Sequence, residues 1–319
     1  MKLSFEQIKN ITVGALHIWE EGGAIRFARC TQKQIDAWNK LDEILGYRAT
    51  ATTGIRLDFH TNSKTFSFVS KAICNYEIYI DNVLTYAYFS KDFENEKRKE
   101  ISLDGKEHRI TLYFPSHDEP GALEAVEIED GASIEPHKFD CKIYFIGDSI
   151  TQGWESTWDS LSYAYHVSRF YNAESVIQGV GGAYYHSTIF DEAIEFEPDI
   201  VIAAFGTNDW VHGYTTIEDG KKECGKFLDK LVSRYGSKKL FGISPIWRAD
   251  ADQVMPMGTF EECVSYVKEE IVNHGMTLID GQLLTPHISD FYSDEYLHPD
   301  TKGFGIYSLN LIAEMQKNM

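Results

Sequence analysis

Long hydrophobic runs and proline are scarce in this sequence, and glycine is no more abundant than in an average protein. Only 8 of the 319 residues are proline and 24 are glycine, which excludes a collagen-like chain and argues against a low-complexity, disordered one. No stretch approaches the ~20 apolar residues of a membrane-spanning helix. The first ten residues are interrupted by Glu6, Lys9 and Asn10 and lack the long apolar core of a secretory leader. The default expectation is therefore a globular protein of the cytoplasm.

Cysteines are few and widely separated. The five residues Cys30, Cys74, Cys141, Cys224 and Cys263 form no Cys-x-x-Cys pair, so they supply neither a zinc knuckle nor a thioredoxin-like motif. An odd number spread through a large chain is typical of reduced, packed thiols. The motifs of a P-loop, a zincin and a nucleophile elbow are also missing. We therefore expect neither a metal nor a cofactor.

Positively charged residues are outnumbered by negatively charged ones. The sequence has 30 Lys and Arg against 49 Asp and Glu, which gives a formal net charge of −19. Such a surface repels nucleic-acid phosphates and anionic lipid headgroups. We therefore expect no nucleic-acid partner and no membrane partner.

The chain length predicts about two domains, and the pattern of the first part, residues 1–138, is that of antiparallel strands. Apolar and polar residues alternate in short segments, and an Asp-Asn pair at 81–82 marks a turn between two of them. Because no strong long helix interrupts this part, we expect an all-β, jelly-roll-like sandwich, with room for a short helix near 31–45. The strand candidates are residues 54–60, 64–70, 77–86, 108–114 and 122–129.

The second part, residues 139–319, alternates short apolar strands with helices. This order predicts a five-stranded parallel sheet covered on both faces, a three-layer α/β/α domain. Thr215 and Thr259 are each followed three residues later by glutamate, a pattern that begins helices. The strand candidates are residues 142–146, 175–177, 199–205, 239–243 and 276–279, and the helix candidates are 160–171, 184–196, 217–235, 259–274 and 302–317.

Polar and glycine-rich segments follow these strands. In a doubly wound sheet, sites form outside the carboxyl ends of the strands, where the strand order reverses. With the order 2-1-3-4-5, this place lies between residues 147–150, after the first strand, and residues 206–209, after the third. Residues 178–183 follow the second strand, and a histidine loop, residues 294–299, precedes the last helix. A nucleophile, amide donors and a base are thus predicted to converge.

These four segments resemble, in chain order, the blocks of the SGNH (GDSL-like) hydrolase superfamily. Residues 147–150 (Gly-Asp-Ser-Ile) match the first block, Gly182 the second, residues 206–209 (Gly-Thr-Asn-Asp) the third and residues 298–299 (His-Pro) the last. The resemblance covers about residues 140–319 and implies a flavodoxin-like α/β/α fold. The preceding sandwich makes the whole chain resemble a two-domain branch that includes carbohydrate esterases.

The chemistry of ester cleavage gives the matched residues their expected roles. A serine hydroxyl is a poor nucleophile until an imidazole accepts its proton, so Ser149 needs His298 within hydrogen-bond reach. The tetrahedral oxyanion that follows needs donors fixed in advance, and the loss of one donor costs roughly 3–4 kcal/mol of barrier. The expected oxyanion hole consists of the Ser149 amide, the Gly182 amide and the Asn208 side chain.

The acid that orients the histidine is ambiguous in this sequence. The family pattern places an aspartate three residues before the histidine, but that position is Glu295, and Asp294 lies one residue earlier. Glu295 is the preferred acid. One alternative is Asp294, which reaches the histidine if the turn between them differs from the family pattern. The other alternative is a backbone carbonyl.

Some further side chains near the strand ends are weaker candidates for substrate contact. Asp209, Trp210 and Trp247 are placed in the predicted binding region, and Trp154 and His212 lie on neighbouring loops. Exposed aromatic rings can stack on sugar rings, whereas core packing is the competing interpretation for the tryptophans.

Together these features predict a serine esterase that removes a short acyl group from a carbohydrate or similar polar substrate, with acetyl as the favoured group. A thioesterase or lysophospholipase-type acyl hydrolase on the same site is the first alternative. A carbohydrate-binding protein without catalysis is the alternative of another class. The expected partner is a small-molecule or carbohydrate ester substrate. A homo-oligomer and the role of the sandwich are left open.

Overall fold

The structure, a computed structural model, describes residues 1–117 and 119–319 and consists of two units. The first, called the sandwich below, comprises Met1–Thr31 and Thr50–Phe139. The second, called the α/β unit, comprises Gln32–Ala49 and Asp140–Met319. The main division falls within one residue of the expected boundary, but residues 32–49 pack with the α/β unit instead of the sandwich.

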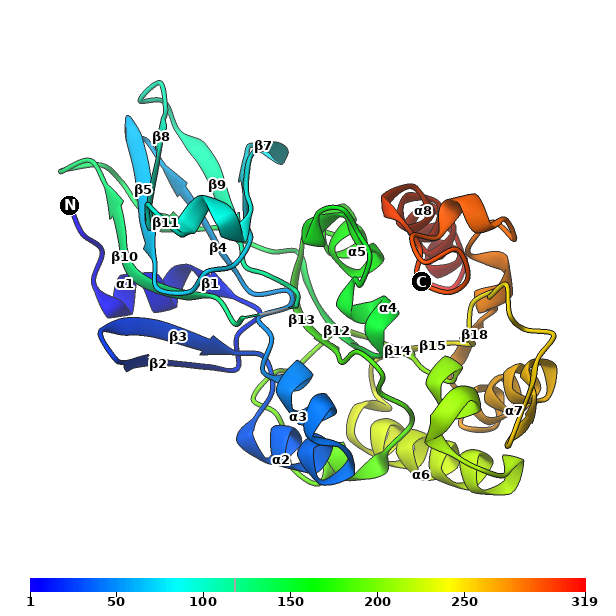
Figure 1. Ribbon diagram of the computed structural model, residues 1–319. Coiled ribbons are helices and arrows are strands. Elements are labelled where there is room, and N and C mark those ends of the chain that lie inside the picture. The colour runs from blue at the N-terminus through cyan, green and yellow to red at the C-terminus, as the bar shows by residue number, and fades with distance from the viewer. Residues whose placement is uncertain (118) are drawn as a thin grey trace. The chain divides into compact units, whose positions relative to one another are not determined.

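The sandwich contains two antiparallel sheets (Figure 1). Its strands are β1 (Thr12–Val13), β2 (His17–Glu21), β3 (Ala24–Ala28), β4 (Arg56–Thr61), β5 (Thr65–Ser70), β6 (Tyr76–Ile80), β7 (Val83–Tyr88), β8 (Arg98–Ser102), β9 (His108–Tyr113), β10 (Ala122–Ile128) and β11 (Glu135–Pro136). One sheet has the order β1-β4-β9-β6-β7, with β11 beside β4, and the other has the order β2-β3-β10-β5-β8. The unit also has helix α1 (Phe5–Ile11) and a 3-10 turn, η1 (Ser90–Phe93). The predicted all-β fold of this part is confirmed.

Period-two alternation in the strands of the sandwich produces its core. Leu57 and Phe59 on β4, and Phe66 and Phe68 on β5, are completely buried in one hydrophobic cluster. The β6–β7 hairpin closes through Asp81 and Asn82 with φ values of 50° and 68°, a left-handed conformation that aspartate and asparagine tolerate. The turn predicted at this pair is therefore present.

The α/β unit is built on a five-stranded parallel sheet. Its strands are β12 (Cys141–Gly147), β13 (Ala173–Gly179), β14 (Ile200–Ala204), β15 (Lys239–Ile243) and β18 (Thr277–Ile279). The order β13-β12-β14-β15-β18 is the predicted order 2-1-3-4-5. Residues 143–146 on β12 are all buried, because helices cover both faces of the sheet.

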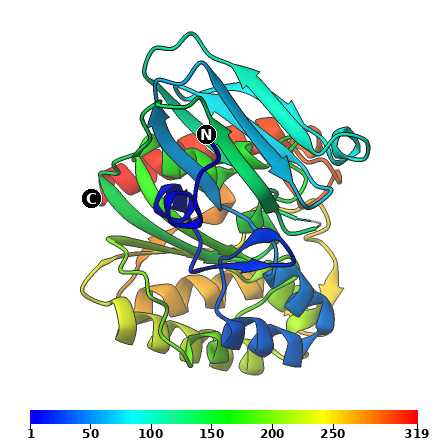
Figure 2. The ribbon, with the colours of Figure 1, turned by 90° about the vertical axis from the view of Figure 1, so that its left-hand side faces the viewer.

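Helices lie on both sides of this sheet. They are α2 (Gln32–Leu41), α3 (Glu43–Ala49), α4 (Ser149–Gln152), α5 (Tyr163–Phe170), α6 (Ile217–Tyr235), α7 (Phe260–Asn273) and α8 (Thr301–Lys317). Helices α5 and α8 cover one face, and α6 and α7 cover the other (Figure 1). Figure 2 shows α2 and α3 on the same side of the sheet as α6. Within the described ranges, no helix combines the length and apolar composition that a membrane crossing requires.

Shorter elements complete the α/β unit. A small hairpin joins β16 (Val254–Met255) and β17 (Gly258–Thr259), and short helical turns are η2 (Asp159–Leu161), η3 (Ser187–Phe190), η4 (Asp209–Gly213), η5 (Gly281–Leu283) and η6 (Ser289–Phe291). The turn η4 is π-helical. Helix α7 begins with the predicted box at Thr259. Helix α6 begins at residue 217, as predicted, but its cap is Thr216 and not Thr215.

The helix predicted over residues 184–196 is wrong, because only the 3-10 turn η3 forms there. Side chains of α6 satisfy the backbone of this segment in place of helical hydrogen bonds. Lys230 donates to the Ser187 carbonyl, and Arg234 donates to the carbonyls of Phe190 and Glu192. Helix α2 packs against η3, so residues 32–41 supply helical cover here.

Hydrogen bonds between glutamine side chains anchor α2 to the sheet. The Gln34 and Gln178 amides bond each other in both directions, at 3.0 and 2.9 Å, and both residues are buried. On the same helix Trp38 is also buried. The short helix expected near 31–45 is therefore real, but it continues as a helical pair and belongs to the other unit.

Candidate active site

Ser149 lies at a tight strand-to-helix turn. Strand β12 ends at Gly147, and Ser149 is the first residue of α4. The preceding Asp148 caps this helix, because its carboxylate accepts a hydrogen bond of 2.9 Å from the Ile150 amide. A Cβ atom at position 147 would lie 2.1 Å from Thr151 Oγ1, so only glycine fits where the strand enters the turn. The capping role therefore belongs to Asp148, and the Ser149 hydroxyl is directed elsewhere.

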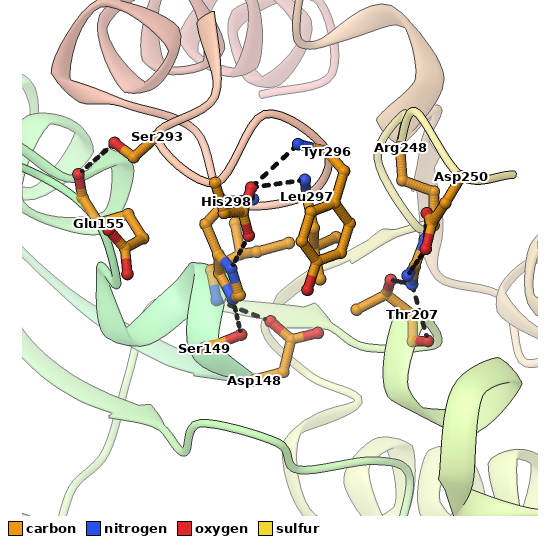
Figure 3. Close-up of polar contacts among 12 residues, drawn as sticks. Asp148, Ser149, Glu155, Thr207, Arg248, Asp250, Ser293, Tyr296, Leu297 and His298 are labelled. Atoms are coloured by element: carbon orange, nitrogen blue, oxygen red, sulfur yellow. Dashed lines mark hydrogen bonds and ion pairs between the residues drawn. The ribbon is translucent and has the colours of Figure 1, made fainter. Parts of the chain in front are cut away.

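The Ser149 hydroxyl contacts His298, as Figure 3 shows. Ser149 Oγ and His298 Nε2 are 2.8 Å apart, although the two residues are separated by 149 positions in the sequence. The histidine lies in the loop before α8, and the loop is closed by a hydrogen bond of 3.0 Å from the Ser293 amide to the His298 carbonyl. The structure thus brings together the two side chains that the proposed nucleophile and base require.

Asp294 is the carboxylate that contacts the histidine, which corrects the preference for Glu295. Asp294 Oδ2 is 2.6 Å from His298 Nδ1, whereas Glu295 is exposed and has a φ of 67°. The loop has one residue more between acid and histidine than the family pattern. The left-handed backbone at Glu295 accommodates this residue by turning the chain, so that Asp294 and not Glu295 faces the imidazole.

Hydrogen bonds also fix the Asp294 carboxylate within its own loop. Its Oδ1 accepts from the backbone amides of Tyr296, Leu297 and His298 at 3.1, 2.8 and 3.0 Å. Burial acts to raise the pKa of Asp294, but the hydrogen bonds from the imidazole and from these amides outweigh it and lower the pKa to about 2. An ionised Asp294 accepts a hydrogen bond from Nδ1–H, which keeps the proton on Nδ1 and leaves the Nε2 lone pair for the Ser149 hydroxyl.

The glycine-rich loop after β13, residues 180–183, lies beside the serine turn. The Val180 amide donates to the Gly147 carbonyl at 2.9 Å, and Gly182 adopts a φ of 82°. Within residues 1–117 and 119–319, the amides of Ser149 and Gly182 donate no hydrogen bond to protein atoms. These two donors remain available for a substrate oxygen.

Asn208 is tied to the same loop. Its Nδ2 donates one hydrogen to the Ala183 carbonyl at 2.9 Å, and the second hydrogen on that nitrogen is not used by any residue of the described ranges. Because this bond fixes the rotamer of Asn208, its side chain is held next to the segment that contains Gly182. The structure thus brings all three expected oxyanion donors to neighbouring segments.

Asp209 and Trp210 do not face the site, which corrects their expected role in substrate binding. Both are completely buried. The Asp209 carboxylate accepts from the Tyr185 amide at 3.2 Å, and Trp210 Nε1 donates to the Gly258 carbonyl at 2.9 Å. The short local pattern placed them next to Asn208, but η4 turns both side chains into the interior.

Trp247 is half-buried and contacts other aromatic rings. It stacks on His287 with ring centroids 5.5 Å apart and lies 5.1 Å from the Tyr292 ring. Its contact with substrate stays a prediction.

A buried arginine braces the loop that carries Asn208. Arg248 Nη1 donates to Thr207 Oγ1 at 2.8 Å, and the guanidinium forms two hydrogen bonds with Asp250 at 2.6 and 2.8 Å (Figure 3). Its carbon Cζ lies 4.6 Å from the centroid of the Trp210 ring. The sequence analysis considered the neighbouring Trp247 but gave Arg248 no role.

Two residues beside the glycine loop extend the site beyond the predicted blocks. The Trp154 ring lies 6.2 Å from the His298 ring, and Arg48 lies over Trp154 with its Cζ 4.6 Å from the ring centroid. Trp154 was among the loop aromatics that the sequence singled out. Arg48 carries no local signal, because it lies on α3, about a hundred residues before Ser149, in a part predicted to belong to the sandwich.

Comparisons with known proteins identify the fold and the family. No curated protein sequence matches the chain. The salicylyl-acyltransferase SsfX3 from a tetracycline biosynthetic pathway superposes with a TM-score of 0.77 at 17% identity, over 96% of this chain and 94% of that one. A putative GDSL-like lipase from Bacteroides ovatus gives a TM-score of 0.70 at 17% identity, over 99% and 97%.

A family two carbohydrate esterase from Clostridium thermocellum, in complex with cellohexaose, gives a TM-score of 0.66 at 16% identity, over 84% of this chain and 93% of that one. At such low identity these structures establish the shared fold. The family model of the GDSL-like lipases and acylhydrolases matches residues 145–306, which is just over half of the chain and contains every block described above. The protein therefore belongs to the GDSL-like lipase/acylhydrolase family.

Proposed function

We propose that this acylhydrolase is a serine esterase that removes a short acyl group, with acetyl as the favoured group, from a carbohydrate or another polar substrate. One observation carries the proposal. Asp294, His298 and Ser149 form a continuous chain of hydrogen bonds, 2.6 Å and 2.8 Å long. This is the arrangement in which a carboxylate orients an imidazole and the imidazole activates a hydroxyl.

In the first half of the reaction the serine becomes acylated. Ser149 Oγ attacks the ester carbonyl carbon while its proton moves to His298 Nε2. The carbonyl electron pair moves onto oxygen and forms a tetrahedral oxyanion. When this intermediate collapses, the bond to the alkoxy oxygen breaks, and the leaving alcohol takes the proton from Nε2. Asp294, which is ionised, stabilises the imidazolium that exists between these two transfers.

In the second half a water molecule releases the acyl group. The water attacks the acyl carbon as His298 Nε2 takes one of its protons, and the bond to Ser149 Oγ then breaks as Oγ recovers that proton. The products are the free alcohol and a carboxylic acid. In both halves the Ser149 and Gly182 amides and Asn208 Nδ2 are the donors for the oxyanion.

The preference for a polar substrate has three supports. The net charge of −19 disfavours an anionic lipid surface as the source of substrate. The Clostridium thermocellum carbohydrate esterase, which shares the fold over 84% of this chain, is described in complex with cellohexaose. The Trp154 ring near His298 supplies an aromatic surface of the kind that stacks on sugar rings.

The decisive experiment replaces the nucleophile. Ser149→Ala should lower the turnover of p-nitrophenyl acetate by about 10⁴-fold or more and should abolish labelling by a fluorophosphonate. Ser168→Ala is the matched control, because the buried Ser168 hydroxyl donates to the Ala164 carbonyl of its own helix, at 2.6 Å. Full activity in Ser149→Ala would refute the proposed nucleophile.

The substrate class is tested by a screen of acetylated sugars, choline esters and acyl-thioesters. We expect the largest kcat/KM for acetylated sugars and a decline as the acyl chain lengthens. A preference for long acyl chains or thioesters would favour the thioesterase or lysophospholipase alternative. A protein whose Ser149 is inert but which still binds glycans would favour the carbohydrate-binding alternative.

A further inference from the structure

The peptide group between Gly181 and Gly182 is held from outside the four sequence blocks. Arg48 Nη1 donates to the Gly181 carbonyl at 2.9 Å. On the other side of Gly181, its amide donates to Gln152 Oε1 on α4 at 2.7 Å. Gly181 is thus fixed at both its amide and its carbonyl by side chains from α3 and α4.

Side chains also hold the carbonyls that follow. His212 Nε2 lies 3.1 Å from the Gly182 carbonyl, and Asn208 binds the Ala183 carbonyl. Three consecutive carbonyls of the loop therefore point toward donors. The Gly182 amide is left without a protein acceptor within the described ranges, as an oxyanion donor must be.

The stereochemistry of the loop does not keep this amide in place by itself. A peptide group is planar and trans, so the Gly181 carbonyl and the Gly182 N–H point in opposite directions. Rotation of this plane by half a turn would carry the φ of Gly182 from 82° to about −98°, an ordinary backbone value. With glycine on both sides, little steric resistance opposes such a flip. The flipped state would aim a carbonyl oxygen at the developing oxyanion.

Arg48 is well placed to prevent that flip. Its guanidinium lies on the Trp154 ring, and a Cβ atom at Gly182 would lie only 3.0 Å from Arg48 Nη1. Neighbouring residues on the same helix, Leu45 and Ala49, are buried, so α3 is a firm base for the side chain. A hydrogen bond to a carbonyl also polarises the N–H of the same peptide group and strengthens it as a donor.

We propose that Arg48 is a positioning residue for the oxyanion hole. Its hydrogen bond to the Gly181 carbonyl keeps the Gly182 N–H directed at the site of the oxyanion. The inference rests on the proposed function, because it assumes that an oxyanion forms beside Ser149. The helical pair α2–α3 would thus complete the active site from a segment that precedes it by a hundred residues.

The test compares Arg48→Ala and Arg48→Lys with the unmodified chain. We expect Arg48→Ala to lower kcat for p-nitrophenyl acetate about 10-fold to 100-fold, since a donor is misplaced and not removed, with KM changed less than about twofold. The rate constant for labelling by a fluorophosphonate should fall by the same factor, because its phosphoryl oxygen occupies the place of the oxyanion. Arg48→Lys should recover part of both rates, because an ammonium can still donate to Gly181 but cannot stack as a plane on Trp154.

Arg234→Ala is the matched control for a merely structural effect. Arg234 also donates to two loop carbonyls, those of Phe190 and Glu192, and lies over an aromatic ring, with its Cζ 5.7 Å from the Phe190 centroid. It makes no contact with residues 180–183 in the described structure. We expect its loss to lower the melting temperature and leave kcat and the labelling rate unchanged.

The outcomes separate this inference from the proposed function. If kcat and the labelling rate of folded Arg48→Ala stay within twofold of the unmodified chain, the inference is overturned. The inference is also overturned if kcat and the labelling rate fall only in proportion to the fraction of Arg48→Ala that is folded. Should Arg48→Ala not fold, the same two rates in folded Arg48→Lys decide, and values equal to those of the unmodified chain overturn it. Failure of a fluorophosphonate to label Ser149 in the unmodified chain would instead refute the proposed function.

Discussion

The side chains of the site are fixed by their local partners more than by their sequence neighbours. Asp294 is held by three backbone amides of its own loop, so its carboxylate is already aligned when it meets His298. Glu295, although it fits the family spacing, occupies the left-handed turn position and faces solvent. A change in loop geometry of a single residue therefore decides which carboxylate supports the imidazole.

We predict that Asp294→Asn lowers kcat about 10²-fold to 10⁴-fold, because the amide has no charge to stabilise the imidazolium and can favour the wrong histidine tautomer. Glu295→Gln is the matched control, with an expected change of less than about twofold. Steady-state turnover of p-nitrophenyl acetate measures both. A larger loss in Glu295→Gln than in Asp294→Asn would return Glu295 to the role of the acid.

At the scale of elements, the crossover between β13 and β14 is unusual. A doubly wound unit normally places a helix there, but this chain forms only η3, and α2 from an earlier part of the chain packs against it. The helical pair α2–α3 also delivers Arg48 to the glycine loop. The helical cover of the sheet and part of the active site thus depend on residues 32–49, which the local sequence pattern assigns to the sandwich.

This dependence predicts that residues 140–319 alone form an incomplete unit. Without α2, Gln178 Nε2 loses its hydrogen bond to Gln34 Oε1 and the surface beneath the helix is exposed to water. The lost hydrogen bond alone is worth about 0.5–1.5 kcal/mol, and the lost burial adds to this. We expect the fragment to melt at a lower temperature than the full chain and to react more slowly with a fluorophosphonate. Circular dichroism and labelling rates measure the two effects.

Adding a peptide of residues 32–49 should restore part of both properties, whereas the same peptide with Arg48→Ala should restore stability more than reactivity. A fragment as stable and as reactive as the full chain would show that the pair is dispensable.

At the scale of the whole molecule, buried carboxylates behind the active site link folding to pH. Burial raises the pKa of Asp209 to about 8 and that of Asp148 to about 6, although backbone amides act against it in both cases. In the unfolded chain such groups ionise near pH 4. Between these values the folded state binds more protons than the unfolded state, so the free energy of unfolding falls as the pH rises.

We predict that Asp209→Asn weakens this dependence, because asparagine does not titrate. The stability of the variant relative to the unmodified chain should increase from pH 5 to pH 8, by on the order of 1.4 kcal/mol for each pH unit over which Asp209 keeps its proton in the folded state. Urea unfolding at several pH values measures the difference. Asp252→Asn, which removes an exposed carboxylate, should change stability by less than about 0.5 kcal/mol. A parallel pH profile for Asp209→Asn and the unmodified chain would contradict the prediction.

The amino-acid sequence is enough to predict the class of each part and the segments that form the site. Alternation with period two gives the strands of the sandwich, and apolar runs between helices give the parallel sheet. The strand order 2-1-3-4-5 is implied by the resemblance to a flavodoxin-like fold. Since the carboxyl ends of parallel strands share one edge, the sequence predicts that the segments containing Ser149, Gly182 and Asn208 lie close together. These features depend on neighbouring residues in the sequence or on the general topology of a parallel sheet.

Contacts that depend on backbone turns and on packing between distant segments could not be predicted from the sequence. The positive φ of Glu295 selects Asp294 as the partner of His298, and the π-helical turn η4 buries Asp209 and Trp210. Arg48 reaches the glycine loop because α2 and α3 find their buried partners in the α/β unit. Periodicity and motif spacing describe neighbours along the chain, whereas these contacts follow from which surfaces bury each other best.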